Sequence, residues 1–101
     1  MVDLVVLCVV QGQGETYGYA IGRELAHAGI TGLGEAAIYA CLRRLHDKGM
    51  LSSRQMVADN GKARRYYALT ESGDEHLEAE LLVWEARRNA VDKITEAGRT
   101  S

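Results

Sequence analysis

The chain has 101 residues, of which 47% are hydrophobic and 26% are charged. This length suffices for one small core and is too short for several. No apolar run approaches the roughly 20 residues that cross a bilayer, and charged and apolar residues are mixed too evenly for a disordered chain, so both of these classes are excluded.

The formal net charge of −2 is the difference between segments of opposite sign. Residues 35–70 carry seven Lys or Arg against three Asp or Glu, whereas residues 71–86 carry six acids and no Lys or Arg. Because a basic segment is the electrostatic footprint of nucleic-acid binding, the negative total does not argue against such a partner.

The two cysteines, Cys8 and Cys41, stand in unrelated apolar contexts, and neither belongs to a CxxC pair or a Cys/His cluster. We therefore expect core-filling thiols, with no disulfide, no metal site and no cofactor. The apolar run 4–10 has no basic residues before it and no cleavage site after it, as a signal peptide would require. The expected location is the cytoplasm.

The first two elements are read from caps and periodicity. Asp3 can cap a helix through residue 10 that the cluster 11–14 ends, although the same Val/Leu run fits a buried strand equally well. Thr16 is a plausible N-cap for a second helix whose apolar positions recur at helical spacing until Gly29, where we expect a left-handed stop.

A third helix and a hairpin follow. Apolar positions from Ile38 to Leu45 predict a helix that stops at Gly49, with Tyr39, Arg43 and Arg44 off its apolar stripe. The strand-like stretches 51–57 and 64–69 flank an Asn-Gly pair, which is a strong hairpin signal. A helix-turn-helix followed by a hairpin with a basic tip predicts a winged helix.

The segment from Thr70 to about Ala97 predicts one long helix, with capping-box spacing at Ser72 and Glu75. At 1.5 Å per residue it would be on the order of 40 Å long, which exceeds what one small core can cover. We therefore expect a homodimer, with a winged-helix domain over 1–70 and a dimerisation helix with a short tail over 71–101. Its interface residues would follow a heptad-like stripe: Leu77, Leu81, Trp84 and Val91.

The chain resembles the PadR family of winged-helix transcriptional regulators over nearly all of its length. The motifs are Tyr17-Gly18-Tyr19 at the second helix, the run 37–45 followed by Gly49-Met50-Leu51, and Trp84 in the last helix. The most specific is the wing segment 61–73, which reads Gly-x-x-Arg-Arg-Tyr-Tyr-x-Leu-Thr-x-x-Gly. The chain departs from the family where Gly34-Glu35 replaces Ser-Pro and Ala40 replaces proline.

Together with the basic segments, the resemblance implies a mainly α protein with a small β-hairpin that binds double-stranded DNA at a pseudo-palindromic operator. The expected DNA-binding residues are Tyr17, Tyr39, Arg43, Lys62, Arg64 and Arg65. Each also has an ordinary reading, as a solvated helix face, a charged hairpin end or a core tyrosine. Because Arg64 and Arg65 alternate along their strand, one of them should face the helical body.

Trp84 has two readings, an aromatic residue of the dimer interface or a platform for a small aromatic effector. The leading hypothesis is a repressor that such an effector releases from DNA. Its main alternative is a winged-helix protein-interaction module that does not bind DNA and uses the acidic segment 71–85. An enzyme is disfavoured, because no catalytic constellation can be assembled from the motifs.

Overall fold

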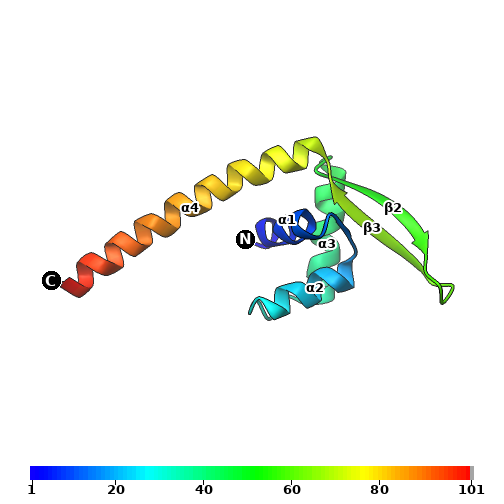
Figure 1. The fold of residues 1–101 in the computed structure, drawn as a ribbon, viewed down its shortest axis with the longest axis horizontal. Coiled ribbons are helices and arrows are strands. Elements are labelled where there is room, and N and C mark those ends of the chain that lie inside the picture. Colours follow the sequence, from blue (N-terminus) through cyan, green and yellow to red (C-terminus); the bar gives the residue numbers. More distant parts are fainter. Residues whose placement is uncertain (101) are drawn as a thin grey trace.

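Residues 1–100, which the computed structural model describes, fold into a small helical body with a β-hairpin on one side and one long projecting helix (Figure 1). The elements are α1 (Val2–Gln13), β1 (Glu15–Thr16), α2 (Gly18–His27), α3 (Glu35–Asp47), β2 (Leu51–Val57), β3 (Ala63–Leu69) and α4 (Glu71–Thr100). This architecture confirms the predicted winged helix-turn-helix. Within the described residues, no helix has the length and apolar content needed for a membrane crossing.

The first segment is a helix, which decides between the two predicted alternatives. Val6, Leu7 and Val10 are fully buried, and their spacing places them on one helical face. This face contacts α2, α3, α4 and β3, so α1 lies at the centre of the core. The predicted Asp3 cap is wrong, because the N-cap is Met1, two residues earlier, and it makes no side-chain capping hydrogen bond.

Helices α2 and α3 end at the predicted glycines, but α2 does not begin at the predicted cap. Gly29 and Gly49 stop α2 and α3 with φ angles of 92° and 78°, and the N–H groups of Ile30 and Met50 reach back to carbonyls five residues earlier at 2.8 and 3.0 Å. The predicted cap at Thr16 is wrong, because Thr16 pairs with Tyr67 in the sheet and is 3% exposed.

The sheet is antiparallel with the order β1-β3-β2, and its short edge strand β1 was not predicted. The hairpin register runs from Leu51 opposite Leu69 to Val57 opposite Ala63. Residues 58–62 form the connecting loop, in which Gly61 adopts a φ of 80°. Leu51 and Tyr67 point toward the core, so the face that carries them is the inner face of the wing.

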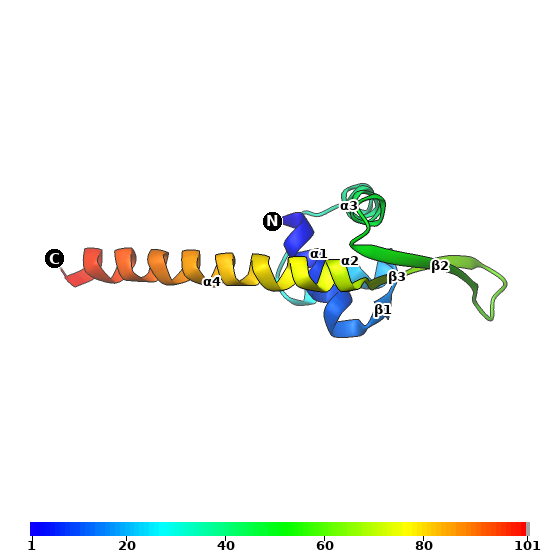
Figure 2. The same ribbon diagram turned by 90° about the horizontal axis from the view of Figure 1, so that it is seen from above.

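Helix α4 is capped by Thr70, whose Oγ1 accepts a 3.0 Å hydrogen bond from the Gly73 N–H. The predicted capping box at Ser72 and Glu75 is therefore wrong. Thirty residues give the helix a length of roughly 45 Å, and it accounts for most of the 62 Å long axis of the molecule (Figure 2).

Only the first turns of α4 pack against the body. Leu77 is fully buried and Leu81 is partly buried against the core. Beyond them the apolar side chains lie exposed: Leu82, Val83, Trp84, Val91 and Ile94. The assignment of Leu77 to a dimer interface is wrong, because the core of its own chain already covers it.

Truncation of Leu77 should therefore be much more destabilising than truncation of its neighbour on the same helix. We expect Leu77→Ala to lower the free energy of unfolding by about 2–5 kcal/mol. The matched variant Leu82→Ala, at a side chain that is 69% exposed, should stay within about 0.5 kcal/mol of the parent. Urea unfolding followed by circular dichroism at equal protein concentration measures both. Equal losses would contradict the core position of Leu77.

Candidate nucleic-acid interface

A concavity of about 360 Å³ lies between α3 and the inner face of the wing. It is lined by Tyr39, Arg43, His46, Ser53, Arg65 and Tyr67. None of these six side chains is acidic, and all of them carry N–H or O–H donors. Such a surface is suited to an anionic group with several acceptor oxygens, such as a phosphate of a nucleic-acid backbone.

The helix α3 supplies half of this surface because of its periodicity. Ile38, Cys41, Leu42 and Leu45 are buried in the core. Tyr39, Arg43 and His46 follow one another at spacings of four and three residues, so they share another face of the helix. His46 also lies 3.8 Å, from Nδ1 to Oδ1, from the exposed Asp47.

Tyr39 is positioned by the closest approach between α2 and α3. A Cβ atom added at Gly18 would lie 2.5 Å from Cε1 of the Tyr39 ring and 3.0 Å from its hydroxyl oxygen. The ring therefore packs directly on the backbone at the start of α2, while Tyr39 as a whole remains 43% exposed. Glycine at position 18 is thus required for the observed orientation of this tyrosine.

Arg65 extends the concavity from the wing. Its guanidinium donates a 3.0 Å hydrogen bond to the Ser53 hydroxyl on the neighbouring strand, and this contact restrains the side chain over the inner face. Arg65 is thus the member of the Arg64/Arg65 pair that faces the helical body, as the alternation predicted. Lys62 lies in the hairpin loop, where its N–H donates to the Asn60 Oδ1 at 3.0 Å.

The neighbouring Arg44 points away from the concavity and forms an ion pair with Asp3 on α1. The Cys41 thiol donates to the same carboxylate at 3.2 Å. Burial raises the pKa of Asp3, but the hydrogen bonds from Cys41 and Arg44 and the charges of Arg44 and Lys48 outweigh it, so this pKa lies below its usual value. Arg44 therefore ties α3 to the first turn of α1 through a partly exposed ion pair.

The Cys41 thiol is kept in its protonated form. Burial, followed by its hydrogen bond to the negatively charged Asp3, raises the pKa of Cys41 to about 12. Burial also raises the pKa of Cys8. Both cysteines are free, and neither has the lowered pKa that distinguishes a reactive thiol.

Arg64 lies on the outer face of the wing, where the ring of Tyr17, the N-cap of α2, packs against it. The Arg64 guanidinium carbon is 4.7 Å from the centroid of the Tyr17 ring, and the Tyr17 and Tyr66 ring centroids are 5.2 Å apart. Beside them, Arg54 donates to both carboxylate oxygens of Glu15 at 2.6 and 2.7 Å. Hydrogen bonding to Arg54 lowers the pKa of Glu15.

The structure thus brings together three of the six predicted DNA-binding residues, Tyr39, Arg43 and Arg65. It places Lys62 at the wing loop and joins Tyr17 to Arg64 on the other side of the sheet. Sequence reasoning missed His46, Ser53 and Tyr67 as lining residues. The spacing of His46 from Arg43 was a usable signal, whereas Ser53 is identified only by the pairing of β2 with β3.

Glu35, at the first position of α3, lines a separate groove together with Tyr19 and Arg23 of α2. Among residues 1–100, no group of three or more His, Cys, Asp or Glu side chains is arranged to hold a metal ion.

Three helices, a hairpin that flanks the third helix, and a donor-lined surface between them define a winged-helix protein. The chain matches the Transcriptional regulator PadR-like family over residues 6–79. This match covers most of the chain and shows that it belongs to that family. The family consists of transcriptional regulators, and the enzyme alternative is therefore not supported.

Solved structures agree with this assignment. A Streptococcus mutans UA159 protein is 29% identical, with a TM-score of 0.83, covering 94% of this chain and 86% of its own. A PadR family transcriptional regulator from Eggerthella lenta DSM 2243 is 30% identical, with a TM-score of 0.77 and coverages of 90% and 80%. Bacillus subtilis PadR, solved with operator DNA, is 25% identical, with a TM-score of 0.71 and coverages of 78% and 45%.

Proposed function

We propose that this chain is a homodimeric, sequence-specific DNA-binding repressor. The observation that carries the proposal is the acid-free concavity in which Arg43 and Arg65 converge from α3 and the wing. The Bacillus subtilis relative bound to operator DNA supports it. A DNA partner also implies that the protein works in the cytoplasm.

In the proposed complex, α3 enters the major groove and Arg43 and Tyr39 lie toward base edges or phosphates. Arg65 holds a backbone phosphate from the inner face of the wing, and Lys62 follows the adjacent backbone or minor groove. Tyr17 and Arg64 support these contacts from the outer face, because their stacking links the start of α2 to the hairpin. The exposed Glu35 disfavours a phosphate at the first turn of α3.

We expect Arg43→Ala and Arg65→Ala each to weaken duplex binding by about 1–3 kcal/mol. A lost phosphate contact should also reduce the slope of log K against log salt by about 0.9. Arg99→Ala, which removes the same charge from the far end of α4, is the matched control and should change neither quantity. Fluorescence polarisation over a range of salt concentrations measures both effects.

Absence of duplex binding by the parent protein even at low ionic strength would contradict the proposal. It would favour the protein-interaction alternative, in which the acidic segment 71–85 serves as the partner surface. Equal losses for Arg99→Ala and Arg65→Ala would contradict the assigned interface, because they would reflect only the total charge.

The uncovered part of α4 supports the proposed homodimer. Trp84 and Val91 are 41% and 59% exposed, and with Leu81 they continue the stripe that begins at the buried Leu77. Burial against the same surface of a second chain would remove this apolar area from water. We therefore propose residues 1–70 as the DNA-binding domain, with α4 joining two such domains; of the tail, Ser101 lies outside the described residues.

Val91→Asp should convert the dimer to a monomer at micromolar concentration, because it would bury a carboxylate in an apolar interface. Leu82→Asp is the matched control. Nine residues separate it from Val91, which is two and a half helical turns, so the two side chains lie on opposite faces. Sedimentation velocity measures the mass. A dimer that survives Val91→Asp, or a parent protein that is monomeric, would contradict the proposed interface.

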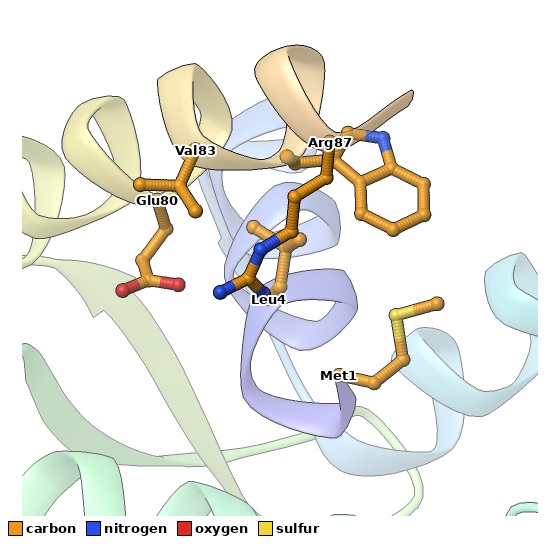
Figure 3. A pocket seen from close by; sticks show the side chains of 6 residues that line it. Met1, Leu4, Glu80, Val83 and Arg87 are labelled. Carbon is orange, nitrogen blue, oxygen red and sulfur yellow. The ribbon is translucent and has the colours of Figure 1, made fainter. Parts of the chain in front are cut away.

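The effector would bind near Trp84. A cavity of about 310 Å³ is lined by Met1, Leu4, Glu80, Val83, Trp84 and Arg87. In Figure 3, Leu4 projects from α1 toward Arg87 of α4, and Met1 lies at the start of α1. Apolar walls, an indole and one guanidinium suit a planar aromatic compound. Because the cavity lies between α1 and α4, occupation of it can change how α4 leaves the body.

Trp84 is the only tryptophan in the chain, so its fluorescence reports directly on this cavity. We expect planar aromatic compounds to quench this fluorescence and to weaken duplex binding over the same concentration range. Leu4→Ala should weaken both effects in parallel. Quenching that leaves duplex affinity unchanged would show adventitious binding and would contradict the effector role.

A further inference from the structure

The start of α4 is fastened to the turn that ends α3 (Figure 1). The Thr70 hydroxyl donates to the Gly49 carbonyl at 2.6 Å, and the Thr70 N–H donates to the Met50 carbonyl at 3.1 Å. The same hydroxyl oxygen accepts the Gly73 N–H at 3.0 Å. One threonine therefore caps α4 and at the same time anchors it to the residues that follow α3.

Gly73 allows an unusually close approach at this point. A Cβ atom built at position 73 would lie 2.0 Å from the carbonyl oxygen of Met50 and 2.9 Å from its carbonyl carbon. Both atoms belong to the backbone, so no change of side-chain rotamer can relieve the clash. An alanine here would require α4 to move relative to the turn after α3.

The turn at Gly49 and Met50 is also fixed to α3. The N–H of Met50 donates to the Leu45 carbonyl at 3.0 Å, and that of Gly49 donates to the His46 carbonyl at 2.9 Å. A continuous backbone path therefore runs from the last turn of the recognition helix, through Gly49 and Met50, to the first turn of α4. The side chain and N–H of Thr70, together with the absence of a side chain at Gly73, close this path.

We propose that Thr70 and Gly73 form a rigid joint that sets the angle between α3 and α4, and thereby the half-site spacing that the dimer reads. The inference rests on the proposed DNA-binding function and on dimerisation through α4. Its specific content is that these two residues determine operator spacing without touching DNA, because they fix where each α3 lies relative to the twofold axis.

The geometry makes spacing sensitive to this joint. Val91 lies eighteen residues beyond Gly73, which is roughly 27 Å along the helix. A tilt of a few degrees at Gly73 therefore displaces α3 by about 2 Å relative to the distal part of α4, which is a large fraction of the 3.4 Å rise per base pair. Small changes at the joint should therefore alter the preferred spacing.

The test compares Gly73→Ala with the parent on two kinds of duplex derived from a selected operator. One carries a single half-site, and the others carry two half-sites whose separation is changed in steps of one base pair. We expect Gly73→Ala to keep its single half-site affinity within about twofold, to lose about tenfold in affinity at the parent spacing, and to prefer a different spacing. Gly12→Ala is the control, because a Cβ at this helical position meets no atom within 4 Å.

A second pair of variants covers the case in which Gly73→Ala does not fold, as judged by circular dichroism. Thr70→Val removes the hydroxyl without adding bulk and should broaden the spacing preference, whereas Thr70→Ser should restore it. An unchanged spacing profile in the folded, dimeric Gly73→Ala or Thr70→Val protein would overturn the joint. Equal loss on single and double half-sites would also overturn it. A parent protein that binds no duplex would instead overturn the proposed function itself.

Discussion

The packing of α4 is the constraint on which the rest of the molecule depends. Its first turns are held by the core, because Leu77 is fully buried and Thr70 ties the helix to the turn after α3. The distal part of the helix projects away from the body, so Val91 and Ile94 stay exposed. A helix that is rigidly attached at one end and uncovered at the other is suited to join two identical bodies at a fixed angle.

Much of the fold could be predicted because the signals for it are local. Helical periodicity and the stops at Gly29 and Gly49 define the helix-turn-helix, and an Asn-Gly pair between two strand-like stretches defines the hairpin. The remaining features depend on tertiary contacts. A run of valines suits a strand as well as a helix until its neighbours are known, and the two-residue strand β1 has no periodicity. Thr16 and Leu77 were misassigned because burial by distant segments, not spacing, decides their places.

The residues of the candidate site likewise fall into those that local spacing predicts and those that only tertiary contacts reveal. Tyr39 and Arg43 were predictable because helical spacing places them off the apolar stripe of α3. The partner of Arg44, Asp3, lies 41 positions away, and no sequence pattern connects the two. Strand alternation separates Arg64 from Arg65, but only the observed packing shows that Arg65 faces α3 while Arg64 stacks on Tyr17. In each of the sequence pairs 43–44 and 64–65, therefore, one arginine lines the concavity and the other binds elsewhere, Arg44 to Asp3 and Arg64 to Tyr17.

The charges are divided between two parts of the fold. Hydrogen-bond donors gather between α3 and the wing, whereas six acidic residues lie in residues 71–86 of α4.

Selection of bound sequences from a random duplex pool tests most directly whether the protein is a dimer that reads DNA sequence, because it reports DNA reading and dimer symmetry together. A twofold dimer should select an inverted-repeat consensus whose half-site centres are about one helical turn, or about 10 base pairs, apart. Enrichment of no sequence, or of a single unrepeated motif, would contradict it.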